Sequence, residues 1–286
     1  MELGIDLTID CVFKKIFGSE ENKELLLELI NGILEEGHEE KVVELEILNP
    51  YNIKDFLTDK LSIVDIKAKD SKGESFIIEI QMHVAQYFPK RILYYWARNY
   101  QNQLKQGERY DLLRKTTIIS ISKEPLPVKT QEYFNHYKLK NIKEEAILCD
   151  DLNIYTIELK HFLKNEDDLK KSIECWTYLM KNSGKIDVDN IPSSLNSPSI
   201  KKAIEELTMF TKDEQARALY ESRRMALMDH VSLLYSEREQ GRAQGIKIGM
   251  EKGIEKTAKK LMQMGLEIEQ ISKATGLSKE ILERLN

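Results

Sequence analysis

The sequence has few of the residues that mark secreted, zinc-binding or membrane proteins. Its 286 residues include three cysteines, far apart and without a CxxC pair, which argues against a disulfide framework or a zinc site. The five histidines show no ligand spacing. No apolar run approaches the ~20 residues of a membrane-spanning helix. The first ten residues are acidic rather than basic. We therefore expect a cytoplasmic protein with reduced thiols and no secretory signal.

Charge of one sign is not in excess overall, but it is unevenly distributed. The formal net charge is −5, and 41% of the residues are hydrophobic, enough for one sizeable core and a second small domain. Residues 1–60 carry six basic and fifteen acidic residues, whereas residues 84–140 carry eleven basic and four acidic ones. The basic block would attract a polyanion, although a basic face that is only solvated would give the same charge pattern.

Two runs of alternating apolar and polar residues, between residues 61 and 83, flank a glycine-containing turn at 70–74. This pattern predicts a β-hairpin. Side chains repeat every two residues along a strand, so Asp65 lies on one face of the first strand, and Glu79 and Gln81 share a face of the second. Carboxylates between Ile, Val and Phe neighbours are costly to bury unless they are paired or bind a metal.

Divalent-metal hydrolysis of phosphodiesters is chemistry that uses such a pair. Mg²⁺ prefers one or two carboxylates, several waters and phosphate oxygens. Asp65 and Glu79 could hold the ion, with the Ile80 backbone carbonyl as a further ligand, while Gln81 orients water or phosphate. Alternatively, the two carboxylates pair with Lys67, Lys69 or another cation on an exposed sheet face.

Several ordered motifs in the first half of the chain carry a family resemblance. They are Asp65 followed after thirteen residues by Glu79-Ile80-Gln81, the upstream run DCVFKKIFG (10–18), and the downstream runs RILYYW (91–96) and GERY (107–110). This set resembles the PD-(D/E)xK nuclease superfamily, and more narrowly its recombination-promoting (Rpn-type), transposase-like branch.

The resemblance implies an α/β fold: a restriction-endonuclease-like α-β-β-β-α-β core with a mixed sheet, followed by an all-helical C-terminal region. It implies a Mg²⁺-dependent (or Mn²⁺-dependent) DNA endonuclease of low sequence specificity, linked to recombination, mobile elements or phage defence. Two positions depart from the superfamily pattern. Val64 replaces proline, and Gln81 replaces lysine, as is common in the Rpn-type branch. The alternative is a catalytically inactive interaction protein with the nuclease fold.

The hydrophobic pattern predicts the elements around the hairpin. Helices are expected at 10–18, 19–36, 90–105, 166–182 and 199–239, strands at 42–48, 116–122, 146–149 and 154–159, and a linker at 184–198. On the helix at 90–105, one side carries Arg91, Tyr94, Tyr95 and Arg98, which could clamp phosphate or only border the core.

Further acids and one histidine are weaker site candidates. In many nucleases of this superfamily, a helix before the first strand supplies another metal ligand, and Glu24 or Glu28 would fit by position. Asp59, ahead of the strand, is another possible ligand, and His83 lies just beyond Gln81. Nothing in the sequence distinguishes DNA from RNA as the substrate.

The sequence predicts three regions: a nuclease-like domain at 1–160, a helical region at 161–240, and a tail at 241–286. Glycines 241, 245, 249 and 253 recur every four residues, so a helix would carry them along one side. Close helix packing there would make a homo-oligomer, whereas a flexible hinge is the other interpretation. The sequence pattern of residues 268–277 resembles a helix-turn-helix. Basic residues are sparse there, however, and we expect a helical cap or interaction tail.

Overall fold

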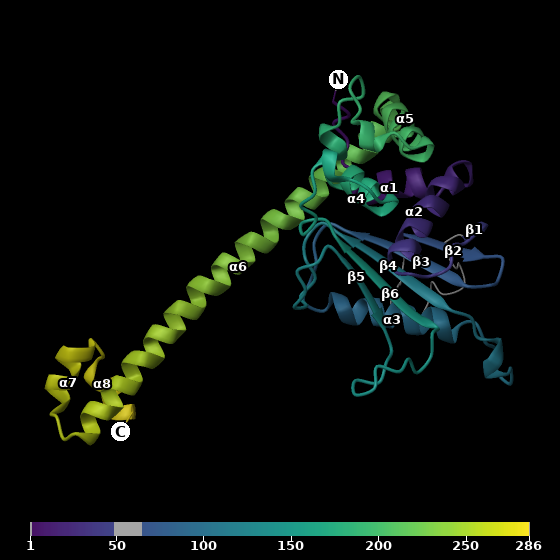
Figure 1. Cartoon of the computed structure of the whole chain (residues 1–286). Helices are drawn as coiled ribbons and strands as arrows, with labels where there is room; N and C mark the ends of the chain where they lie inside the picture. Colours follow the sequence, from purple (N-terminus) through teal and green to yellow (C-terminus); the bar gives the residue numbers. More distant parts are fainter. Residues whose placement is uncertain (1, 49–64, 286) are drawn as a thin grey trace. The chain divides into compact units, whose positions relative to one another are not determined.

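The computed structural model describes residues 2–48 and 65–285. Within it the chain forms two compact units, Met1–Arg223 and Arg224–Asn286. The first unit holds the whole sheet and the helices that cover it (Figure 1). The functional boundaries expected at residues 160 and 240 stay predictions.

The sheet has six strands in the order β1-β2-β3-β4-β6-β5. β3 pairs in parallel with β4, and β4 with β6, whereas the other neighbours are antiparallel. The mixed sheet of the expected nuclease core is thus confirmed. The strands are Leu45–Leu48 (β1), Ile66–Asp70 (β2), Ser75–Gln81 (β3), Thr116–Ser122 (β4), Phe134–Lys138 (β5) and Leu152–Glu158 (β6).

The central strands are buried on both faces, which explains their composition. β4 is buried along its whole length, and β3 at every residue except Gln81. Both are rich in isoleucine, as expected of parallel strands that helices cover on both sides. Glu79 is therefore an exception in the middle of an apolar strand.

Helices lie on both faces of this sheet (Figure 1). One face carries α1 (Asp10–Phe17), α2 (Lys23–Glu36), α4 (Ser172–Asn182) and α5 (Pro198–Lys212), and the other carries α3 (Phe88–Gln101). Short 3₁₀ turns occur at Glu20–Asn22, Tyr110–Leu112, Glu166–Asp168, Ser183–Lys185 and Ser193–Leu195.

The packing of α3 positions the candidate site. Phe88, Ile92 and Tyr95 of α3 pack against Ile77 and Ile118 of the sheet. Burying a side chain of this size contributes roughly 1.5–3 kcal/mol. This contact fixes the first turns of α3 next to the second half of β3, where Glu79 and Gln81 lie.

One predicted strand, at 146–149, is wrong. Those residues are exposed, and only an isolated bridge joins Lys140 to Ile147. The sheet edge is instead β5, which the sequence pattern did not indicate. Its Phe134 and His136 rings lie 5.8 and 4.1 Å from the ring of Tyr155. Aromatic packing on a buried neighbour thus holds an edge strand that lacks clear alternation.

Several helix boundaries also differ from expectation. α4 begins at Ser172 rather than at 166, because the backbone N–H groups of Lys170 and Lys171 donate to the Glu174 carboxylate and end the preceding turn. The predicted helix at 199–239 is divided at Asp213. Its side chain accepts from two backbone N–H groups of the next helix, as a capping residue does.

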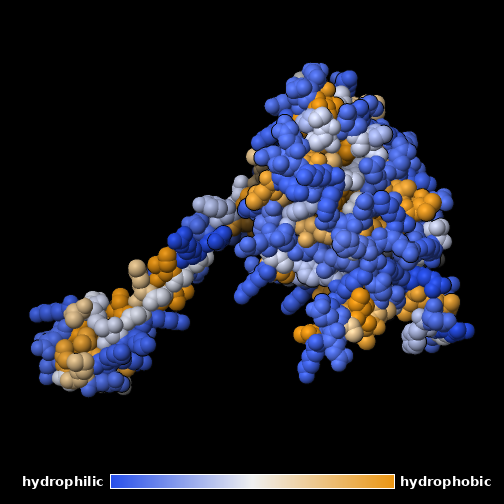
Figure 2. Space-filling model, in the orientation of Figure 1, coloured by the Kyte–Doolittle hydropathy of each residue, from blue (hydrophilic) through white to orange (hydrophobic). Residues whose placement is uncertain are grey.

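The second unit is built on the long helix α6 (Glu214–Gln263), which begins in the first unit. The short helices α7 (Ile268–Thr275) and α8 (Lys279–Leu285) pack on its end through Ala258, Ile271 and Leu282. Figure 2 shows apolar residues interspersed with hydrophilic ones along the exposed part of α6. No helix of the described residues is long and apolar enough to cross a bilayer.

Candidate active site

Asp65 and Glu79 lie across from each other where β2 begins. Ile66 pairs with Ile78 in the antiparallel register, so the next pair outward is Asp65 with Glu79. Asp65 Oδ2 accepts a hydrogen bond from the Ile80 backbone N–H at 2.8 Å, which ties its carboxylate to β3. The hairpin therefore brings both carboxylates to one region of the sheet, as the two-residue periodicity predicts.

Two cations from separate helices meet these carboxylates. Lys14 Nζ of α1 lies 2.9 Å from Asp65 Oδ1, and Arg91 Nη2 of α3 lies 3.4 Å from Glu79 Oε2. Arg91 also donates a hydrogen bond to Gln81 Oε1. Among the described residues, neither carboxylate has the alternative pairing with Lys67 or Lys69. The ion pairs are tertiary contacts rather than contacts within one sheet face.

Glu79 is only 5% exposed, although it carries a carboxylate. Burial raises the pKa of Glu79 to about 7. Arg91 opposes that shift and Asp65 adds to it. The Arg91 contact is long for a hydrogen bond, so it offsets the desolvation only in part. The site thus holds a carboxyl group whose ionised form is only partly compensated by the cations around it.

Arg91 is placed by aromatic side chains of its own helix. Its guanidinium carbon lies 4.5 Å from the centre of the Phe88 ring and 5.8 Å from that of Tyr95. Arg91 therefore faces the carboxylates, with 31% of its side chain exposed. Of its predicted companions, Tyr94 is 46% exposed, and Arg98 is half-buried and engaged in an interaction of its own.

The weaker acid candidates lie elsewhere or outside the described residues. Glu24 forms an ion pair with Lys202 of α5, on the other helix layer. Glu28 lies near Cys175 of α4 and raises the pKa of that thiol slightly, after burial and Glu174. Asp59 lies outside the described residues, and His83 is half-buried just after Gln81. None of the described ones joins the carboxylate pair.

Sequence reasoning gave Lys14 no role, placed Tyr95 on the expected phosphate side of its helix, and offered Lys67 only as a partner of the carboxylates. Lys14 belongs to the upstream motif, but nothing in the pattern indicates that it reaches Asp65. Tyr95 is 9% exposed, and burial followed by the charge of Glu79 raises the pKa of its phenol. Lys67 is half-buried, and burial followed by the neighbouring Lys69 lowers its pKa. For Lys67, the one signal in the sequence is its position two residues after Asp65, which puts both side chains on the same strand face.

The donor set of the pair fits a hard divalent cation. Asp65 and Glu79 offer carboxylate oxygens, the ligands that Mg²⁺ and Mn²⁺ favour, and Mg²⁺ usually keeps several waters beside one or two carboxylates. The described residues contain no group of three metal-ligating side chains, so most ligands would be water or substrate oxygen. The Ile80 backbone N–H donates to Asp65, and the Ile80 carbonyl stays a predicted ligand.

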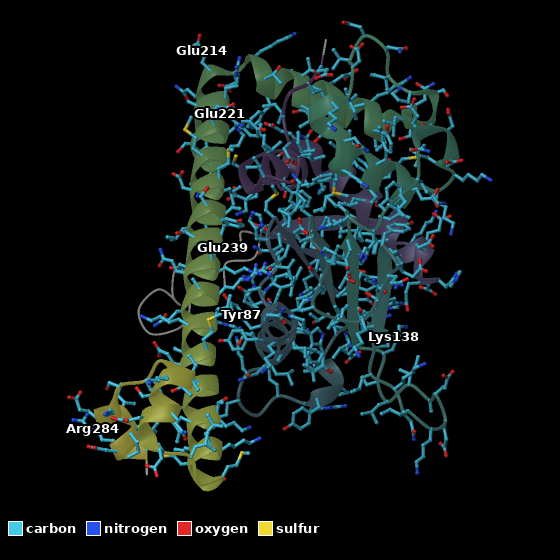
Figure 3. All side chains as sticks on the ribbon, turned by 90° about the vertical axis from the view of Figure 1, so that its left-hand side faces the viewer. Tyr87, Lys138, Glu214, Glu221, Glu239 and Arg284 are labelled. Carbon is cyan, nitrogen blue, oxygen red and sulfur yellow. The ribbon has the colours of Figure 1, made fainter. Side chains whose placement is uncertain are left out.

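A second charged cluster lies at the other end of the same strands. Lys115 Nζ is 3.0 Å from Glu39 Oε2 and 2.7 Å from Asp150 Oδ2, and Lys138 bridges the same two carboxylates. We call these four residues the Glu39 network; Figure 3 labels Lys138. A cavity of about 310 Å³ beside it is lined in part by Glu39, Lys115 and Asp150. Because every charge there is paired, we interpret the network as structural.

The comparison with protein families places the chain. The family described as PD-(D/E)XK nuclease family transposase matches residues 7–237, most of the 286 residues. No match was found among curated proteins or among solved structures. The matched range includes the hairpin with its carboxylate pair, Lys14 and Arg91. On this match and the mixed sheet that carries the pair, the chain belongs to the PD-(D/E)XK nuclease family transposases.

Proposed function

We propose that this protein is a metal-dependent endonuclease that hydrolyses phosphodiester bonds of DNA with little sequence specificity. Asp65 and Glu79 would hold Mg²⁺ or Mn²⁺, and Gln81 would orient the attacking water or the phosphate. Arg91, Tyr94 and Arg98, on one side of α3, would contact the DNA backbone. Since phosphate contacts would dominate, binding should weaken as the salt concentration rises.

The proposed reaction is hydrolysis of a phosphodiester, in which one phosphorus–oxygen bond forms and another breaks. The oxygen of water forms a bond to phosphorus, the bond from phosphorus to one sugar oxygen breaks, and that oxygen takes up a proton while water loses one. When bound, the metal supplies Lewis-acid activation of the phosphoryl oxygen and of the water. Glu79 and Asp65 provide the negative charge that fixes the ion, and Gln81 contributes a neutral hydrogen-bonding amide.

The observation that carries this proposal is the buried, undercompensated Glu79 opposite Asp65. A carboxyl group with a pKa near 7, next to a second carboxylate, is the arrangement that a dication stabilises and that perturbed functional sites show. A structural ion pair would instead lower the pKa of the carboxyl group, as in the Glu39 network.

The test is cleavage of supercoiled plasmid and of single-stranded RNA with Mg²⁺ or Mn²⁺. We expect the wild type to nick plasmid, and Asp65→Ala and Glu79→Ala to abolish nicking. Glu46→Ala removes an exposed carboxylate from the neighbouring strand β1 and should cut like the wild type. Equal cleavage by all four proteins would show that the activity does not come from this site. Cleavage of RNA but not of plasmid would mean that RNA, rather than DNA, is the substrate.

A second candidate is a catalytically silent interaction protein that keeps the nuclease fold. The observation in its favour is that Lys14 and Arg91 already contact both carboxylates, while Gln81 provides no charge. Calorimetric titration with Mn²⁺ distinguishes the two functions. A nuclease should bind the ion and lose binding on Glu79→Gln, whereas a silent domain should show no heat that depends on Glu79.

The biological setting belongs to the same proposal. We infer a cytoplasmic nuclease that acts in DNA recombination, in mobile-element movement or in phage defence. The supporting observations are the transposase family match and three cysteines that all remain free thiols.

We also propose that α6 forms a homo-oligomer through Gly241, Gly245, Gly249 and Gly253. Apart from the backbone of its own helix, a Cβ atom at each of these positions would meet no atom within 4 Å, so larger side chains should leave the subunit intact. The double variant Gly245→Leu/Gly249→Leu should therefore change only association. Ultracentrifugation of the full chain should show a smaller species for this variant than for the control Lys247→Ala. An unchanged mass would contradict the proposal.

A further inference from the structure

Lys67 occupies a place on β2 that connects it to the carboxylate pair. It follows Asp65 by two residues, so both side chains leave the strand on the same face. The register pairs Lys67 with Ile77, one position before Glu79 on that face of β3. Ile77 is in turn covered by Phe88, Ile92 and Tyr95 of α3. The stem of Lys67 therefore starts two register pairs from Asp65 and Glu79, on the same face of the sheet and beside the helix that carries Arg91.

The charge of Lys67 is not balanced by the described residues. Its side chain is half-buried, and no described carboxylate lies within ion-pair distance of it. The other half-buried lysines near the sheet have partners: Lys14 with Asp65, and Lys115 and Lys138 with two acids each. A partly desolvated ammonium without a counter-charge costs free energy. Its position is suited to an anion that arrives from outside.

The charges of the site itself indicate what that anion is. Lys14 and Arg91 already contact Asp65 and Glu79, so any charge that Arg91 offers a phosphate is shared with Glu79, and Gln81 is neutral. A phosphodiester carries one negative charge per phosphate, and a lysine ammonium binds phosphate as a point charge. Among the described residues of β2 on this face, Lys67 and Lys69 form no ion pair with a described acid, and Lys67 is the half-buried one nearer the pair.

We propose that Lys67 binds a non-bridging phosphate oxygen of the nucleic acid at this site and stabilises the charge that develops on the phosphoryl group. This inference rests on the proposed nuclease function and supplies the positive charge that Gln81 does not. In this role Lys67 acts as a cation and transfers no proton.

The test compares Lys67→Met with Lys69→Met. Lys69 lies on the same strand and the same face, two residues further from Asp65, and is exposed. Fluorescence anisotropy with a labelled duplex in EDTA gives the dependence of the binding constant on salt. Lys67→Met should reduce the slope of log K against log salt by about 1, the loss of one phosphate contact. Lys67→Arg should keep the wild-type slope, and so should Lys69→Met.

Turnover should follow the same order. With Mg²⁺, Lys67→Met should cut about 100-fold more slowly than the wild type, as for loss of one donor to a developing negative charge. If Lys67→Met keeps the wild-type slope, or if both methionine variants lose it equally, the assignment to Lys67 is wrong.

Thermal melting separates this role from a structural one and from failure of the nuclease proposal. Without phosphate, Lys67→Met should melt at or above the wild-type temperature, because it removes an unbalanced charge; a clear fall would mean a structural lysine and overturn the inference. If the wild type neither binds nor cuts nucleic acid, the proposed function fails. Thermal melting with added inorganic phosphate then tests whether Lys67 forms an anion site. Stabilisation of the wild type but not of Lys67→Met would support an anion site, and equal responses would refute it.

Discussion

The two ends of the same sheet hold charged clusters of opposite character. In the Glu39 network, two lysines alternate with two carboxylates: three of the contacts are 2.7–3.0 Å long, and the contact of Lys138 with Glu39 is also close. The lysine partners lower the pKa values of Glu39 and Asp150 despite some burial. At the carboxylate pair, the one cation contact of Glu79 among the described residues is 3.4 Å long, and burial raises its pKa to about 7.

The difference shows how to tell a structural cluster from a functional one. Both regions have about as many cations as acids, so counting charges does not separate them. Geometry does, because close alternating contacts compensate desolvation, whereas a buried acid with one distant cation is left short of positive charge. The first arrangement stabilises a connection between strand ends. The second is more stable when an additional cation or a proton is bound.

The largest expected effect is on catalysis. Glu79→Gln should lower the rate of plasmid cleavage by about 1000-fold, the order found when a group that organises transition-state charge is removed. Glu39→Gln, an equivalent change at the other end of the sheet, should keep the rate within about threefold of wild type. Nicking assays under single-turnover conditions with Mg²⁺ measure both. Comparable losses in both variants would mean that cleavage follows fold stability rather than the Glu79 carboxylate.

The next effect is a dependence of stability on pH without metal. Glu79 binds its proton more tightly in the folded chain, with a pKa of about 7 against 4.5. Its contribution to the free energy of unfolding therefore rises by about 3 kcal/mol as the pH falls from 8 to 4.5. Glu39 and Asp150 have the opposite effect, and at lower pH. Their contribution to stability is lost as the pH falls through their reduced pKa values.

Urea denaturation in EDTA between pH 5 and pH 8 measures this term as the difference between the wild type and Glu79→Gln. Other buried acids titrate in both proteins and cancel in that difference. The variant should be the more stable protein at pH 8 and lose its advantage by pH 5. A difference that does not change with pH would mean that Glu79 is ionised throughout, as in a structural ion pair.

A smaller effect is expected from disrupting the Glu39 network. Glu39→Gln leaves Lys115 and Lys138 with Asp150 alone, which is half-exposed. We expect a loss of about 2 kcal/mol in the free energy of unfolding at pH 7, typical of hydrogen bonds to charged partners. Exposed Glu46→Gln on β1 provides the control and should change stability by less than about 0.5 kcal/mol. A loss equal to that control would show that the network contributes nothing measurable.

The sequence predicted one half of this comparison better than the other. The hairpin and the mutual position of Asp65 and Glu79 depend only on strand periodicity and on a short turn, which are local. The Glu39 network joins residues 39, 115, 138 and 150, which no pattern connects, and one of its supporting strands, β5, was missed. An edge strand held by rings packed against Tyr155 has no local signature.

At the candidate site, the sequence identified the acids but not what surrounds them. Lys14 reaches Asp65 from a helix some fifty residues earlier, and Arg91 was expected to face phosphate rather than Glu79. Burial decides the pKa of Glu79, and burial depends on how α3 packs over the sheet. These are tertiary properties, so residue types and spacing alone could not supply them.

The smallest expected effect tests whether Arg91 really only offsets part of the cost of burying Glu79. Arg91→Met keeps the length of the side chain and its packing on Phe88 while removing the charge that lowers the pKa of Glu79. The pKa of Glu79 should then rise further, by about one unit. Carbon-detected NMR titration of the Glu79 carboxyl group in EDTA would measure it, with Arg109→Met, at an exposed pair, as the control. If the pKa of Glu79 fell or stayed constant, Arg91 would not be the group that stabilises the ionised form of Glu79. The contrast with the Glu39 network would then depend on burial alone.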